Sequence, residues 1–187
     1  DVLGSRGLGD VYKRQIIYSA ALMGFFWGQV RLGERTQSER SWQKASEVAL
    51  GHSCDEALPY YVSLKHRFED NPYFLYNYAA VFTEAKEYEK ALKVALECRK
   101  YWADYDLELL LGDIYIAKTD YKQAEGYYMS ASYMCPSRFL PLYQLYELYK
   151  YIGNTEKASE LAKILLEKPA KVNSALIRKI RYMVKKD

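Results

Sequence analysis

The stretch that decides the fold is residues 111–136, LGDIYIAKTDYKQAEGYYMSASYMCP. It carries Gly112 in its first half and the pair Ala124-x3-Tyr128 in its second, and it ends on Pro136. Residues three and four apart share one face of a helix, and small residues let a second helix approach closely. The stretch therefore predicts two short helices that pack against each other and end in a turn.

The same pattern recurs along the chain at a nearly constant period. Matching alanines stand 34, 33 and 34 residues apart, at Ala57, Ala91, Ala124 and Ala158. This period and these helix signatures resemble the tetratricopeptide repeat, a helix–turn–helix unit of 34 residues. The resemblance covers residues 38–170, with a degenerate first unit. It implies an all-α solenoid of about four repeats with an extended concave surface.

Tyrosine is unusually abundant, with 20 residues in a chain of 187 that is 50% hydrophobic. This composition is enough to build a core and excludes intrinsic disorder. Six of the tyrosines fall on repeat positions that demand a large ring, so we expect them to pack between helices. They are Tyr78, Tyr88, Tyr115, Tyr121, Tyr128 and Tyr149.

No set of catalytic or metal-binding residues can be assembled from the sequence. The two histidines, His52 and His66, lack any accompanying ligand motif, and the three cysteines are odd in number and far apart. We therefore expect no enzyme activity, cofactor or metal site in this fragment. The net charge of +3 is too small to indicate nucleic acid as a partner.

The N-terminal region differs from the repeats in composition. Residues 1–15 contain three glycines and no apolar period, and they read as a non-native scar. Residues 16–30 carry no charge, which predicts a truncated transmembrane or interfacial helix; a buried helix of a soluble domain is the alternative. The basic linker 31–37 follows, and the basic residues there and just beyond favour a cytoplasmic repeat domain at a bacterial inner membrane.

The C-terminal segment 171–187 is predicted to be a basic capping helix. Residues 168–187 hold seven Lys or Arg and one acid, a local charge of +6, so the rest of the chain carries −3. Solenoid ends need a polar outer face, which favours capping. A basic amphipathic helix could instead lie on an anionic membrane.

A second resemblance concerns the stretches 134–143, MCPSRFLPLY, and 168–174, KPAKVNS. They resemble the C-terminal repeat region of O-antigen ligase-like membrane proteins of Bacteroidetes-type bacteria, whose membrane domain transfers polysaccharide to lipid A core. The resemblance implies that this chain follows such a ligase or polymerase as a non-catalytic scaffold. Alternatives are an accessory part of the ligase that contacts an anionic glycolipid, and a free-standing soluble adaptor. The candidate anion contacts are Arg138, Lys168 and Lys171.

The repeat register predicts which side chains line the concave groove. The first helix of each unit faces the groove in this family, and the residues so placed are aromatic and mixed in charge. They lack the Lys, Asn and Arg cluster that holds chaperone tails, so we expect a protein or peptide partner of another kind, or a stacked sugar ring. The predicted groove residues are Trp42, Tyr73, Tyr76, Asp106, Asp113, Tyr143, Glu147, Lys150 and Tyr151.

Overall fold

The computed structural model of the chain describes the backbone of residues 2–51, 53–172 and 174–186, and the side chains of these ranges from residue 12 onward. These ranges form nine α-helices and one short 3₁₀ helix, and they contain no strand. The helices are α1 (Val2–Gly51), α2 (Cys54–Leu64), η1 (Lys65–Arg67), α3 (Pro72–Glu84), α4 (Tyr88–Arg99), α5 (Tyr105–Ala117), α6 (Tyr121–Met134), α7 (Leu140–Tyr151), α8 (Thr155–Glu167) and α9 (Ala175–Lys186).

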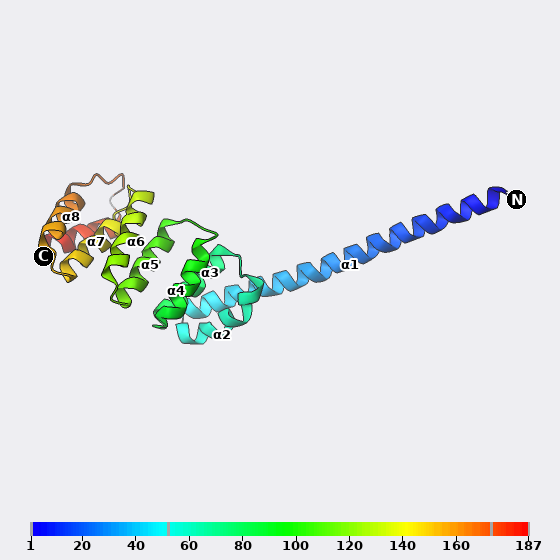
Figure 1. The fold of residues 1–187 in the computed structure, drawn as a ribbon, viewed down its shortest axis with the longest axis horizontal. Coiled ribbons are helices and arrows are strands. Elements are labelled where there is room, and N and C mark those ends of the chain that lie inside the picture. The colour runs from blue at the N-terminus through cyan, green and yellow to red at the C-terminus, as the bar shows by residue number, and fades with distance from the viewer. Residues whose placement is uncertain (1, 52, 173, 187) are drawn as a thin grey trace.

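The helices stack as pairs along one elongated array (Figure 1). The pairs are α1 with α2, α3 with α4, α5 with α6 and α7 with α8, and each helix packs most closely on its partner. In addition, α3 packs against α1 and α5, whereas no two of α2, α4, α6 and α8 make a comparable contact in the described part of the chain. The first helices of the pairs therefore lie on the inner, concave side. The prediction of an all-α repeat array is confirmed.

Three turns inside the pairs repeat the same backbone geometry. Lys86, Thr119 and Gly153 adopt positive φ angles of 61°, 60° and 76°. In each turn the next residue donates its N–H to a carbonyl five residues earlier, as in Asp120 to Tyr115 at 2.9 Å. This pairing satisfies carbonyls that the helix end would leave unbonded. Only the last of the three turns has the glycine that a left-handed conformation favours.

Lys86→Gly is expected to raise the free energy of unfolding by roughly 0.5–1 kcal/mol, because glycine removes the cost of a side chain in the left-handed region. The reciprocal change Gly153→Ala is expected to lower it by about 1 kcal/mol. A Cβ added at Gly153 meets nothing within 4 Å, so the backbone alone sets that cost. Urea unfolding measures both, and a loss of stability in Lys86→Gly would contradict the argument.

Side-chain caps fix where the helices begin. The side chain of Asn71 accepts hydrogen bonds from the N–H groups of Tyr73 and Phe74, at 3.0 and 3.1 Å. Asp104, Asp120 and Asn154 cap α5, α6 and α8 in the same manner. Each cap satisfies an N–H group that has no partner within its helix.

Aromatic rings fill much of the space between the pairs. In the first half of the array, Tyr61 stacks on Tyr78 with ring centroids 5.6 Å apart, and Tyr78 contacts Phe82 at 4.5 Å. Large buried rings contribute strongly to a core of this kind. The packing role predicted for six tyrosines is confirmed: Tyr78, Tyr128 and Tyr149 are buried, and Tyr88, Tyr115 and Tyr121 pack half-buried against the core.

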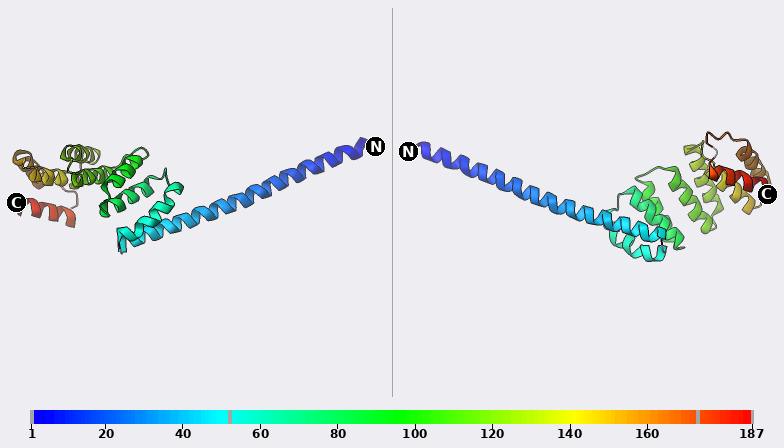
Figure 2. Two further views of the ribbon diagram at one scale, coloured as in Figure 1. Left: turned by 60° about the horizontal axis from the view of Figure 1, so that its bottom comes forward. Right: turned by 180° about the vertical axis from the view of Figure 1, so that it is seen from behind.

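The long helix α1 projects from the array (Figures 1 and 2). It passes without interruption through positions 15, 30 and 37, where composition placed boundaries, because its isolated glycines cost too little to break it. Side chains between residues 12 and 37 lie almost entirely exposed, and Ser38 is the first that is buried. No helix in the described ranges is both long and apolar enough to cross a membrane.

Candidate functional site

The candidate site is the groove along the inner helices α3, α5 and α7. The structure groups six of the nine predicted groove residues in two places. Tyr73 and Tyr76 belong to an aromatic patch, with the charge of Asp106 near Tyr76. Asp113, Glu147 and Tyr151 line a cavity.

The aromatic patch consists of Tyr73, Tyr76 and Trp102. The ring of Trp102 lies 5.2 Å from that of Tyr73 and 5.8 Å from that of Tyr76, with the second pair nearly perpendicular. Tyr73 is 61% exposed, whereas Tyr76 is half-buried. Burial raises the pKa of Tyr76, and the neighbouring carboxylates of Asp106, Asp104 and Asp113 raise it further. The patch is therefore apolar at its centre and bordered by negative charge.

The cavity lies between α5 and α7 and has a volume of about 510 Å³. Its walls include Tyr121 and Tyr151, whose ring centroids are 5.5 Å apart, and the aliphatic chains of Ile116 and Leu148. Asp113 and Glu147 also line the cavity, together with Thr119, Tyr128 and Gln144. The volume falls within the range of roughly 300–1,000 Å³ that ligand pockets occupy.

Asp113 links three helices at the wall of the cavity. Its carboxylate accepts a hydrogen bond from the Tyr128 hydroxyl at 2.6 Å, from α6, and a longer one from Gln144 at 3.4 Å, from α7. Burial raises the pKa of Asp113, although the bond from Tyr128 opposes the rise. The carboxylate is thus held in a fixed position in a partly dry environment.

The other three predicted groove residues, Trp42, Tyr143 and Lys150, lie outside the aromatic patch and the cavity between α5 and α7. The ring of Trp42 lies 5.3 Å from that of Phe68 and 5.6 Å from that of Phe74, so Trp42 packs against the core. It also lines a separate cavity of about 790 Å³ between α1 and the segment from η1 to the start of α3. The Tyr143 hydroxyl lies 3.5 Å from the Met183 sulfur of α9. The Lys150 ammonium lies 5.3 Å from the centre of the Tyr146 ring. The repeat register places a residue on an inner helix, but it does not show whether side chains from later segments of the chain cover that residue.

Trp102 and Tyr121 are among the site residues that the repeat register did not identify. Trp102 lies in the loop before α5, and the register considered only helical positions; its place just before the Asp104 cap was the available signal. Tyr121 was assigned to packing, and it both packs and lines the cavity. Each lies at a helix end, where a side chain can face the core and the groove together.

The three predicted anion contacts are only partly free. Lys168 donates a hydrogen bond to the Pro136 carbonyl, and its ammonium lies 5.7 Å from the centre of the Phe139 ring, so it closes the end of the array. The exposed Arg138 stacks over Tyr105 at 5.6 Å, and Lys171 is exposed.

In α9, which packs on α8, Ile180 and Val184 are buried.

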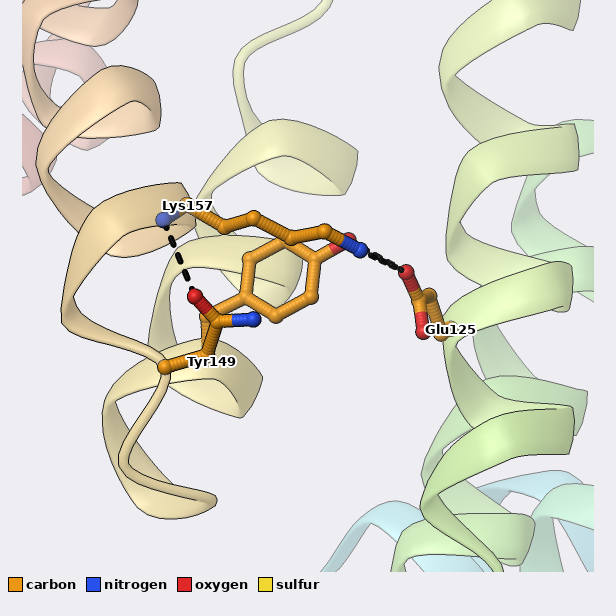
Figure 3. Close-up of polar contacts among 4 residues, drawn as sticks. Glu125, Tyr149 and Lys157 are labelled. Carbon is orange, nitrogen blue, oxygen red and sulfur yellow. Dashed lines mark hydrogen bonds and ion pairs between the residues drawn. The ribbon is translucent and has the colours of Figure 1, made fainter.

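A polar network joins the third and fourth helix pairs (Figure 3). Glu125 of α6 accepts hydrogen bonds from the Tyr149 hydroxyl at 2.5 Å and from the Lys157 ammonium at 2.9 Å. The same ammonium lies 4.8 Å from the centre of the Tyr149 ring. The bond from Tyr149, followed by the bond from Lys157, lowers the pKa of Glu125. The network therefore favours the ionised form of Glu125.

Glu125→Gln is expected to destabilise the array near neutral pH, and the difference from the parent protein is expected to shrink in acid. Because the folded-state pKa of Glu125 is lowered, its contribution is present above the ordinary pKa of about 4.3 and is lost as pH falls through the folded-state value. Asp113→Asn should behave oppositely, because the raised pKa of Asp113 costs stability as pH rises. Urea unfolding at about pH 7 and about pH 3.5 distinguishes the two. A Glu125→Gln difference that grows in acid would contradict this assignment.

Two of the three thiols, those of Cys54 and Cys98, are in environments that suppress their reactivity. Burial raises the pKa of Cys98 to about 11, and its thiol donates to the Pro72 carbonyl at 3.2 Å. Burial also raises the pKa of Cys54, with smaller effects from Glu84 and Asp55. A thiol that stays protonated is a poor nucleophile. The described ranges also hold no group of three or more His, Cys, Asp or Glu suited to a metal ion.

Solved structures share this architecture. No protein-family model matches the sequence, and a comparison with curated proteins gives no match either. A fragment of MamA from Desulfovibrio magneticus RS-1 is similar at a TM-score of 0.65 and 16% identity, covering 78% of this chain and 76% of that one. For Pseudomonas aeruginosa PilF the values are 0.61 and 15%, covering 80% and 68%.

A third similar structure is YrrB, described as a TPR protein with an unusual peptide-binding site. Its TM-score is 0.56 at 13% identity, with coverage of 79% of this chain and 86% of that one. Likeness at such identities concerns the backbone. The chain therefore has the fold of tetratricopeptide repeat proteins.

Proposed function

We propose that the chain is a non-catalytic protein-interaction scaffold that holds an extended peptide segment in its concave groove. The aromatic patch carries the proposal. A large exposed ring at Tyr73, backed by Trp102 and Tyr76, offers apolar area on an inner helix, and tyrosine and tryptophan are enriched among the residues that dominate binding energy at interfaces. YrrB, described as a TPR protein with an unusual peptide-binding site, supports this use of the fold.

The test is site-specific photo-crosslinking of the full chain with a biotinylated random dodecapeptide pool. A photoreactive phenylalanine analogue replaces Tyr73 in one protein and Tyr133 in the other. Tyr133 is a matched control, because it is 72% exposed and lies on the second helix of its pair. We expect labelling at position 73 to exceed labelling at 133 several-fold. Equal labelling at the two positions would refute groove binding.

A second proposal concerns the membrane. We propose that residues 16–30 of α1 attach the scaffold to the bacterial inner membrane, with the repeats on the cytoplasmic side. Phe25, Phe26 and Trp27 are 62–66% exposed, and Arg31 stacks over Trp27 at 5.0 Å, which suits an interface helix followed by positive charge. The ligase-like parent rests on the sequence resemblance alone, and the comparisons give it no support. Further hydrophobic spans in the genomic sequence upstream would support that parent.

Vesicle flotation of the full chain tests the attachment. Vesicles of phosphatidylethanolamine and phosphatidylglycerol should carry the protein upward, and Phe25→Ser with Phe26→Ser should abolish this. Tyr101→Ser with Tyr133→Ser is the control, because both tyrosines are exposed on the repeat array. Equal flotation of the two double variants would exclude attachment through α1.

A further inference from the structure

We propose that the cavity between α5 and α7 binds a lysine or arginine side chain of the segment held in the groove. The inference rests on the proposed function and names the chemistry of its partner. A basic side chain fits because the cavity combines carboxylates that lack a counter-charge, aliphatic walls and aromatic rings.

The missing counter-charge distinguishes the two cavity carboxylates from most shielded carboxylates in the described ranges; Asp104, which caps α5, is another without an ion pair. Three other shielded carboxylates each have a basic partner: Glu97 with Lys65 at 3.1 Å, Glu108 with Arg99 at 2.7 Å, and Glu125 with Lys157 at 2.9 Å. In contrast, the cavity carboxylates of Asp113 and Glu147 have no basic side chain within ion-pair distance in the described ranges.

This difference favours a cation from outside the chain. A half-buried carboxylate without a counter-charge carries a desolvation cost that a bound cation would offset. Burial already raises the pKa of Asp113, which reflects that cost. Because Asp113 is held by Tyr128 and Gln144, its carboxylate is positioned before a partner arrives. Preorganisation of this kind lowers the entropy lost on binding.

The walls of the cavity suit a long basic side chain better than a small ion. Ile116 and Leu148 match the aliphatic stem of lysine or arginine, and the nearby rings of Tyr121 and Tyr151 would suit cation–π contact with its charged end. The chain uses the same pairing internally, with Lys157 over Tyr149 at 4.8 Å. A volume of about 510 Å³ accommodates such a side chain together with part of its backbone.

The experiment compares peptide pools that differ only in charge at one position. Random dodecapeptides carry lysine, acetyl-lysine, glutamate or leucine at a fixed central position, and their binding to the full chain is measured by fluorescence anisotropy. Acetylation removes the charge and keeps the aliphatic stem. We expect the lysine pool to bind about tenfold more tightly than the acetyl-lysine pool, equivalent to about 1.4 kcal/mol.

The double variant Asp113→Asn with Glu147→Gln should lose this discrimination. Asparagine at position 113 can still accept the hydrogen bond from the Tyr128 hydroxyl. If circular dichroism shows that the double variant does not fold, the single variant Glu147→Gln decides the question. Glu160→Gln is the matched control, because Glu160 is exposed on α8, away from the cavity. It should keep the full tenfold preference.

The outcomes separate the two proposals. Peptide binding without a preference for lysine, or a preference that survives in the cavity variants, overturns this inference and leaves groove binding intact. Binding by no pool, together with equal crosslinking at positions 73 and 133, overturns both. Loss of preference in the cavity variants but not in Glu160→Gln establishes the cavity as the site.

Discussion

Gly112→Ala is expected to destabilise the array by about 3 kcal/mol. An added Cβ would lie 2.3 Å from Cε1 and 2.5 Å from Cδ1 of Tyr128, far inside van der Waals contact. Tyr128 cannot turn aside cheaply, because its ring is buried between α5 and α6 and its hydroxyl is bonded to Asp113. The two helices would have to separate. Urea unfolding followed by circular dichroism measures the loss.

The control for this change lies on the neighbouring helix. Gly126 of α6 is exposed, and an added Cβ there meets nothing within 4 Å. Gly126→Ala should therefore stabilise the protein by roughly 0.5–1 kcal/mol through helix propensity alone. Combining Gly112→Ala with Tyr128→Leu should recover part of the loss. Similar effects of the two alanine substitutions would show that close helix approach at Gly112 is unimportant.

Arg99→Met is the second change with a large expected effect, again about 3 kcal/mol of destabilisation. Glu108 is 1% exposed, and Arg99 bonds both of its carboxylate oxygens, at 2.7 and 3.3 Å. Arg99 also lies over the Tyr127 ring at 5.2 Å. Without Arg99 the carboxylate would remain buried with no counter-charge, which is costly even though the intact pair adds little net stability. Denaturant unfolding at neutral pH measures the effect.

Two further variants test the reason for that loss. In the double variant Arg99→Met with Glu108→Leu no buried charge remains, so it should be more stable than Arg99→Met alone. Arg35→Met is the surface control, because Arg35 and Glu39 form an exposed pair on α1, and its effect should stay below about 0.5 kcal/mol. If Arg99→Met is no more harmful than Arg35→Met, the buried pair is not the cause.

The repeat pattern predicted the fold because it reports local packing. Where two helices cross closely, as at Gly112 and Ala124, the residue must be small, and the facing Tyr128 must be large. The 34-residue spacing of such positions therefore predicts the repeat architecture. Helix α1 was predicted less well. Changes in composition at residues 15, 30 and 37 suggested separate segments. Stretches of different composition can nevertheless form one continuous helix, as α1 does.

The candidate site could be predicted only in part. The register identified Tyr73, Tyr76 and Asp113 as inner-helix residues, but a cavity depends on how neighbouring pairs tilt against each other. The bond between Gln144 and Asp113 joins residues 31 apart in sequence, and no local pattern encodes it. The register also predicted Trp42 as a groove residue, but two rings from later segments pack against it in the folded chain.

The long first helix also determines how far apart two simultaneous contacts can lie. At 1.5 Å per residue, the stretch from Ile16 to the first buried side chain at Ser38 extends roughly 33 Å. A partner in the groove and a second contact near the start of α1 would therefore not collide. The continuous helix separates these two positions, and shortening it by whole turns would reduce that separation without altering the groove.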